Sequence, residues 1–210
     1  MPEQLGLRAR KKLETRRRIQ REALRLFADR GFEKVTVAEV ADAADVSQAT
    51  VFNYFDTKED LVLDGMSAYG HSLVAALAAR PPTTSVLDAF RSHLLEPRGI
   101  LADDDPGAMD DLVRVRGMIA ASPALQAREH LIADGIATEL AGLFADDRAD
   151  GVRPFFLATA VVGVTRAITR EVHRLALEGL PGTAIAAIVL PQGAAAVDIL
   201  SRGLSDQASP

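Results

Sequence analysis

Six neighbouring side chains near the amino end carry groups that can contact the edges and phosphates of nucleic acid. They occupy one short segment: Gln48, Ala49, Thr50, Phe52, Asn53 and Tyr54. Gln and Asn can form paired hydrogen bonds with adenine, Ala and Phe can touch a thymine methyl group, and Thr and Tyr hydroxyls can reach phosphates or base edges. The set indicates recognition of a groove, and no other segment has the residue spacing of an active site.

The elements that position these side chains are marked by helix caps. Thr36 can cap one helix, with Glu39 at the capping-box position, and Ser47 can cap the short helix that follows and ends near Tyr54. The amides at the start of a helix favour anions, which places Ser47 near the nucleic acid backbone. Asp45 lies in the turn between the two helices. We therefore expect a helix-turn-helix over residues 36–55.

The apolar residues of this segment define two inner faces, one on each helix: Val37, Val40, Ala41 and Ala44, then Val46, Val51 and Phe55. Only residues 44–46 connect the helices, so the pair crosses at a steep angle and the second helix protrudes. The alternative on spacing alone is a small helical hairpin with a polar exterior.

Charge is distributed unevenly along the 210 residues, whose net charge is −5. Residues 1–35 hold 11 Lys or Arg against 5 Asp or Glu, whereas residues 36–60 hold 1 against 6 and residues 61–210 hold 12 against 18. A basic end is expected of a protein that faces phosphates there. The basic helix in front and Lys58 behind would flank the groove. The alternative is a solvated basic tail.

The whole chain is predicted to be all-α, because Ala, Leu, Arg and Glu dominate and apolar residues recur at helical spacing. After a loose arm at 1–9, we expect the first helix over Lys11–Arg30 and a fourth from a Thr57 cap to about Ala79. Further helices are expected over Val86–Leu101, Met109–Ala121, Pro123–Phe144, Arg153–Glu178 and Thr183–Gly203, with a kink at Pro191.

Composition narrows the function classes. The absence of cysteine excludes disulfides, thiolate zinc sites and a cysteine nucleophile, and it fits a reducing cytosol. The four histidines share no metal-ligand spacing, so we expect neither metal nor cofactor. No apolar run has the length of a membrane span and the amino end lacks a signal-peptide pattern, so no membrane contact is expected.

The segment RLFADRGFEKVTVAEVADAADVSQATVFNYFDTKEDL resembles the DNA-binding domain of the tetracycline-repressor (TetR/AcrR) family of bacterial transcription regulators. The matching marks are LF-x-x-x-GF from Leu26 to Phe32, Thr36, Val40-Ala41, Val46-Ser47, Thr50, Tyr54-Phe55 and K-E-x-L from Lys58 to Leu61. They cover about 50 residues and are specific in combination. The remainder of the chain has no motif that we can place.

The resemblance implies a DNA-binding domain at residues 1–56, with three helices, and a helical ligand-sensing and dimerisation domain at 57–210, about nine helices in all. By position, Gln48, Ala49 and Asn53 would read bases, and Thr36, Thr50, Tyr54 and Lys58 would contact the DNA backbone. Two residues depart from the family pattern. Asp45 replaces a common glycine but tolerates left-handed geometry. Phe52 replaces a frequent tyrosine, which favours an apolar base contact over a phosphate contact.

The last two helices contain small residues three and four apart: Ala160, Gly163 and Ala167, then Ala184, Ala187, Ala194 and Ala195. The resemblance assigns these helices to a homodimer interface, although such stripes could equally pack against the chain's own core. Two-fold symmetry would let paired DNA-binding domains read a palindromic operator in double-stranded DNA.

A small-molecule effector would bind among the helices spanning 86–178. Candidate lining residues are Phe90, His93, Leu94, Met118, Leu131, Phe155, Phe156, Thr159 and Arg166, and Arg114 or Arg116 could meet an anionic ligand. Each is individually more typical of plain core or surface, because Met and Phe commonly fill cores.

The sequence therefore predicts a cytoplasmic, nucleoid-associated regulator that represses transcription until a small molecule releases it from its operator. An activator with the same DNA-binding domain, or an architectural DNA-binding protein without a ligand, are the alternatives. An enzyme is disfavoured because no G-x-S-x-G, H-E-x-x-H, P-loop or G-x-G-x-x-G motif occurs.

Overall fold

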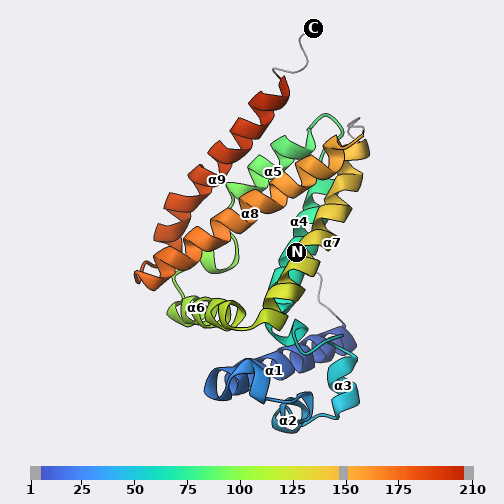
Figure 1. Ribbon diagram of the computed structural model, residues 1–210, viewed down its shortest axis with the longest axis vertical. Helices are drawn as coiled ribbons and strands as arrows, with labels where there is room; N and C mark the ends of the chain where they lie inside the picture. The colour runs from blue at the N-terminus through green and yellow to red at the C-terminus, as the bar shows by residue number, and fades with distance from the viewer. Residues whose placement is uncertain (1–5, 147–150, 206–210) are drawn as a thin grey trace. The chain divides into compact units, whose positions relative to one another are not determined.

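The computed structural model describes residues 6–146 and 151–205, and the described chain is built from helices. Figure 1 shows their arrangement along the chain. The elements are α1 (Leu7–Arg30), η1 (Phe32–Lys34), α2 (Val37–Ala43), α3 (Gln48–Phe52), α4 (Asp60–Ala78), α5 (Val86–Leu94), η2 (Gly99–Leu101), α6 (Pro106–Ala121), α7 (Pro123–Asp146), α8 (Arg153–Leu177) and α9 (Gly182–Ser205). The all-α class predicted from the sequence is confirmed.

The helices pack as two units. The head unit contains the chain up to Gly65 together with Arg114–Glu129, and the body unit contains Met66–Val113 and the chain from His130 on. The predicted functional division at residues 56 and 57 stays a prediction. It differs from these packing units because the first turns of α4 and the segment 114–129 belong to the head unit.

The core of the head unit contains most of the predicted inner faces of α2 and α3. Of the predicted residues, Val37 and Val46 are half-buried and the others are buried: Val40, Ala41, Ala44, Val51 and Phe55. Phe27 of α1 is buried with them and meets Phe32 edge to face with ring centroids 5.1 Å apart. Aromatic pairs of this geometry add stability beyond the apolar area that they remove from water. The head therefore has its own apolar centre beneath α2 and α3.

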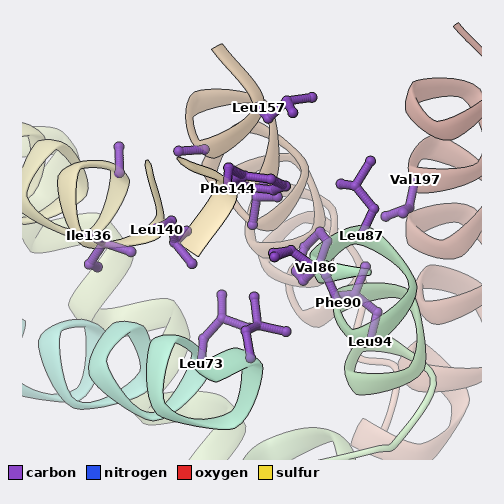
Figure 2. Packing of buried hydrophobic residues seen from close by; sticks show 14 residues of the cluster. Leu73, Val86, Leu87, Phe90, Leu94, Ile136, Leu140, Phe144, Leu157 and Val197 are labelled. Atoms are coloured by element: carbon purple, nitrogen blue, oxygen red, sulfur yellow. The ribbon is translucent and has the colours of Figure 1, made fainter. Parts of the chain in front are cut away.

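The body unit is held by a cluster of apolar side chains from α4, α5, α7, α8 and α9, of which Figure 2 labels ten. Phe90 and Leu140 are fully buried in it. A second cluster joins α6, α8 and α9 around Ile185 and Val189. α9 therefore takes part in both clusters.

One predicted body helix is wrong. The expected helix over Val86–Leu101 ends at Leu94, and only η2 is helical in its second half. Pro97 disfavours helical geometry at the residue before it, and Gly99 adopts a positive φ of 54°. These two residues break the helix. The other predicted helices are present with ends shifted by a few residues. α1 begins at Leu7, so the loose segment predicted at 1–9 is wrong for its last three residues.

α9 continues through Pro191 as one helix, and the kink predicted there stays a prediction. Asp60–Ala78 of α4 and Gly182–Gly203 of α9 are long and apolar enough to cross a membrane by length and composition alone. Core helices of soluble proteins meet the same criterion, and both helices bury leucines or valines in the clusters above. The criterion therefore does not assign either helix to a membrane.

The start of α9 is set by a distant loop. Asp104 Oδ1 accepts hydrogen bonds from the backbone N–H of Thr183, at 2.9 Å, and from its hydroxyl, at 2.8 Å. A side chain added at Gly182 would overlap the backbone oxygens of Ile100 and Asp103. The loop after η2 thus supplies the cap of α9, and only glycine leaves room for it.

We predict that Gly182→Ala lowers the free energy of unfolding by about 1–3 kcal/mol, because a methyl group there displaces backbone rather than a flexible side chain. Gly142→Ala is the matched control. It lies within α7 with no atom near the added carbon, so it should raise stability by up to about 1 kcal/mol. Chemical unfolding followed by circular dichroism measures both. Equal effects would contradict the close backbone approach.

Candidate nucleic-acid interface

α2 begins with a capping box. The backbone N–H of Thr36 donates to Glu39 Oε2 at 2.8 Å, and the N–H of Glu39 donates to Thr36 Oγ1 at 3.3 Å. Arg30 adds an ion pair to Glu39 at 2.7 Å. Two of the amides that a helix start leaves unpaired are thereby satisfied. The Thr36 hydroxyl also donates to Glu39, so its hydrogen is engaged locally at 2.8 Å.

The turn between α2 and α3 depends on Asp45, which adopts a φ of 50°. The following amide, of Val46, donates back to Ala41 O at 3.0 Å and closes the end of α2. Asp visits the left-handed region more readily than most residues with a side chain. The expectation that Asp45 preserves this turn is confirmed.

α3 has only five residues, and its start is capped as predicted. Ser47 Oγ accepts from the amide of Thr50 at 3.0 Å, and the two hydroxyl oxygens lie 2.7 Å apart. On the inner side, Val51 and the following Phe55 are 1% and 2% exposed. α3 is therefore held by two buried anchors and one cap.

The outer side of α3 presents the side chains that the sequence picks out for base contacts. Gln48, Ala49 and Asn53 are exposed, and Phe52 is 46% exposed although it is large and apolar. Thr50 and Tyr54 are half-buried beside them. The structure thus gathers these residues on one accessible face.

Lys58 lies across the aromatic pair of the head core. Its ammonium group is 4.2 Å from the ring centroid of Phe32 and 5.8 Å from that of Phe27. A cation over a ring face is attracted by the negative charge of the π system. Lys58 is half-buried there, so contacts within the head fix its position.

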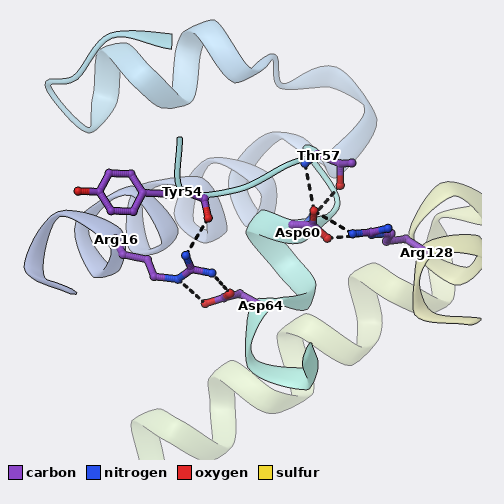
Figure 3. A network of polar contacts seen from close by, with 6 residues as sticks. All are labelled: Arg16, Tyr54, Thr57, Asp60, Asp64 and Arg128. Carbon is purple, nitrogen blue, oxygen red and sulfur yellow. Dashed lines mark hydrogen bonds and ion pairs between the residues drawn. The ribbon is translucent and has the colours of Figure 1, made fainter. Parts of the chain in front are cut away.

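Arg16 of α1, which the sequence did not single out, ties the end of α3 to the rest of the head. Nη1 donates to the backbone oxygen of Tyr54 at 2.7 Å, and the guanidinium pairs with both carboxylate oxygens of Asp64 in α4 (Figure 3). It also lies 4.5 Å from the ring centroid of Phe55. The hydrogen bonds with Asp64 raise the pKa of Arg16. No local sequence signal marks this residue, because it is one of several arginines in a row.

The segment 114–129 contacts the start of α4. Arg128 donates to both carboxylate oxygens of Asp60, at 2.9 and 3.2 Å, and Asp60 also accepts from the amide of Thr57 at 3.0 Å (Figure 3). Ser122 donates to Glu33 at 2.6 Å. The predicted Thr57 cap is present, since the amide of Asp60 donates to Thr57 Oγ1. These contacts hold the start of α4 from two sides.

Comparison with known proteins identifies the family. Residues 19–64 match the model for bacterial regulatory proteins of the tetR family. The chain is also 31% identical over 172 residues to the HTH-type transcriptional regulator TcmR of Streptomyces glaucescens, which covers 79% of this chain and 76% of TcmR. The chain belongs to the TetR family. As a member of the TetR family, it is a DNA-binding transcriptional regulator.

One further relative agrees with this assignment, and one solved structure shares the fold. Over 50 residues, 24% of each chain, this TetR-family protein is 48% identical to the HTH-type transcriptional regulator LuxR of Vibrio harveyi. The solved structure of NalD, the secondary repressor of the MexAB-OprM multidrug efflux pump in Pseudomonas aeruginosa, aligns with a TM-score of 0.52 at 16% identity, covering 87% of this chain and 96% of NalD. The latter supports the fold.

The residues predicted to line an effector pocket differ in burial and belong to both packing units. Phe90 and Leu94 are buried in the body core, and His93 is half-buried with its pKa lowered, first by burial and then by Arg98. Met118 belongs to the head unit. The remaining candidates, Leu131, Phe155, Phe156, Thr159 and Arg166, are at least partly exposed. Their role stays a prediction.

An open groove of about 370 Å³ lies elsewhere in the body unit, between the chain around η2 and the first half of α9. Its lining is almost wholly apolar: Leu95, Pro97, Leu101, Ala102, Thr183, Ala186, Ala187, Leu190 and Pro191. The sequence pattern gave no sign of this groove, because it forms between segments far apart in the chain. Among the described residues, no group of three or more His, Asp or Glu side chains could hold a metal ion.

We predict that Glu39→Gln removes part of the acid sensitivity of the protein. The Thr36 amide, then Arg30 and the Thr36 hydroxyl, lower the pKa of Glu39 from 4.5 to about 2. A carboxylate whose folded pKa lies below its unfolded value contributes stability above the unfolded value and loses it as the pH falls toward the folded one. The variant should therefore be less stable than the parent at neutral pH and approach it as the pH falls from about 4.5 to about 2.

Unfolding by urea at a series of pH values, followed by circular dichroism, measures this difference. Asp42→Asn is the matched control, because it removes an exposed carboxylate from the same helix that has no side-chain hydrogen bond to a described residue. It should leave the acid dependence close to that of the parent. A Glu39→Gln variant that stays below the parent by the same amount at every pH would contradict the prediction.

Proposed function

We propose that this protein is a repressor that occupies a palindromic operator and leaves it when a small molecule binds. The observation that supports this proposal is the exposed face of α3. The amide side chains of Gln48 and Asn53 are exposed there, while Val51 and Phe55 are buried in the head core and hold the helix in place. Polar side chains on a protruding, well-anchored helix suit the floor of a major groove.

The side chains divide into two roles. Gln48, Ala49 and Asn53 read base edges, and Phe52 makes an apolar contact with a thymine methyl group. The backbone contacts come from the residues around them: Thr36, Ser47, Thr50, Tyr54 and Lys58. The hydroxyls of Thr36 and Thr50 already have partners within the head, so each phosphate contact there exchanges or shares an existing hydrogen bond.

We propose that two copies associate through α8 and α9. On α9, exposed residues follow at intervals of four: Ala187, Pro191, Ala195 and Ile199. On α8, Gly163 and Ala167 are exposed, and nothing lies near the missing side chain of Gly163. Ala194, which the sequence grouped with these, is instead buried. Small exposed residues beside large apolar ones such as Ile199 suit close packing of helices between protomers.

Repression is released by linkage. A small molecule that binds one conformation of the body more tightly than the DNA-binding conformation lowers the affinity of the protein for DNA. By linkage, bound DNA lowers the affinity for the small molecule by the same factor. The groove beside α9 has a volume near the lower end of small-molecule sites, about 300–1,000 Å³. It shares Ala187 and Pro191 with the face proposed for dimerisation, so an effector bound there would also meet the partner copy.

The function is tested by selecting bound sequences from a pool of random duplexes with the purified full chain. Enrichment of a palindrome with half-sites about 10 base pairs apart supports the proposal. The selected duplex is then titrated over a salt series, where affinity should fall steeply with salt. A protein that binds no duplex at low salt would refute the proposed function.

We predict that Gln48→Ala and Asn53→Ala each reduce discrimination at particular operator positions, by about 1–3 kcal/mol for each paired hydrogen bond to a base that is removed. Lys58→Gln should instead weaken binding to selected and random duplexes alike, because a phosphate contact carries no sequence information. Fluorescence anisotropy with single-base operator variants measures both. A change of preferred sequence in the Lys58 variant would reverse the assigned roles.

We predict that Ala195→Glu converts the protein to monomers, because it places a charge on the exposed face of α9 where the partner would exclude water. Ala76→Glu makes the same change at an exposed position of α4 and should leave the mass unchanged. Light scattering after size exclusion reports the mass of each variant. If the Ala195 variant has the mass of a dimer and its dimer is as stable as that of the parent, the interface lies elsewhere.

A further inference from the structure

The first three turns of α1 carry an excess of positive charge that is largely unpaired among the described residues. Residues 8–18, hereafter the basic arm, contain one acid, Glu14, and seven bases: Arg8, Arg10, Lys11, Lys12, Arg16, Arg17 and Arg18. None of its side chains is buried, and the buried face of α1 begins at Ile19, where the match to the family model also begins. The arm is therefore an addition to the packed head.

Arg16 is the member of the arm whose side chain is paired with described residues. The other six bases form no hydrogen bond or ion pair with any described residue, whereas Arg25 and Arg30 farther along α1 are both paired with carboxylates. The nearest acids of α4 are also engaged, Asp64 by Arg16 and Asp60 by Arg128. With Asp60 and Asp64 paired in this way, the acids near the arm include Glu14 and the exposed Asp56. The described chain thus leaves most of the arm's charge without a counter-charge.

The arm also opposes the rules of helix stability. The first turn of α1 contains no acid, and its N-cap is Gly6, which offers no side-chain hydrogen bond. Bases at the positive end of a helix dipole are unfavourable, and like charges four residues apart, such as Arg8 and Lys12, repel each other. A run of bases kept in a helix at such a cost indicates an external anion that offsets it.

The arm begins beside the end of α3. Arg16 at its base donates to the backbone oxygen of Tyr54, two residues after α3 ends, and this contact fixes where the arm leaves the head (Figure 3). Its 11 residues span about 16 Å at about 1.5 Å per residue. Duplex DNA presents one negative charge per about 1.7 Å, so an arm of this length matches roughly five base pairs.

We propose that the basic arm binds the phosphates of duplex DNA that flanks the groove occupied by α3. This inference rests on the proposed function, and it adds a contact that is independent of sequence and lengthens the DNA that each protomer covers. Lys and Arg on a solvated helix reach phosphates through long side chains, which gives affinity without base readout.

The test compares three triple variants of the full chain on a labelled 30-base-pair duplex of random sequence. The arm variant is Arg10→Gln/Lys11→Gln/Lys12→Gln, with substitutions that favour helix. The matched control, Arg80→Gln/Arg91→Gln/Arg98→Gln, removes the same charge from the body unit outside the two helices proposed to dimerise. A third variant, Arg10→Lys/Lys11→Arg/Lys12→Arg, keeps every charge of the arm.

We predict that the arm variant binds the duplex at least about tenfold more weakly, and that its log–log salt slope falls by about 0.9 for each phosphate that is no longer neutralised. The control and the charge-preserving variant should stay within about twofold of the parent. With the selected operator, adding five base pairs at each end should strengthen binding of the parent and not of the arm variant. Circular dichroism checks that all three variants keep their helix content.

The outcomes separate this inference from the function on which it rests. A parent that binds DNA while the arm variant matches the control refutes the arm and leaves the role of α3 intact. Unchanged DNA binding with an altered mass in light scattering would assign the arm to another protein surface and would also refute the inference. Failure of the parent to bind any duplex refutes both.

Discussion

The fold around the candidate interface depends on the burial of Val51 and Phe55. Isolated helices shorter than about 12–15 residues are marginal in water, so the five residues of α3 cannot hold their conformation alone. Two apolar side chains with 1% and 2% exposure, a serine cap and the Arg16 contact to the Tyr54 oxygen supply what the helix lacks. The orientation of Gln48 and Asn53 is thus a property of the head core.

The elements of the head could be predicted from the sequence because their signals are local. Thr36 with Glu39, Ser47, and Thr57 with Asp60 are caps that act over three residues, and each forms the expected hydrogen bond. The identity of the buried face follows from helical spacing. Short-range hydrogen bonding and amphipathic periodicity suffice for such elements, because neither requires knowledge of the rest of the fold.

The remaining features depend on contacts between distant residues. Arg16 and Asp64 are 48 residues apart, and Ser122 and Glu33 are 89 apart, so no short window along the chain contains both partners. The helix expected at 86–101 is wrong for a different reason, since a general apolar pattern does not outweigh the local effects of Pro97 and Gly99. The prediction of effector residues rests on residue type, and type alone does not distinguish the buried Phe90 from the exposed Phe155 and Phe156.

The amino end of α9 depends on a contact with a distant loop, because Asp104 accepts the hydrogen bonds that cap this helix at Thr183. The helix has no acid in its first turn, and the carboxylate that serves its first amides comes from 79 residues earlier in the chain. Loop closure must therefore come before the last helix is complete at its amino end, and that end should be among the late parts of the body to form.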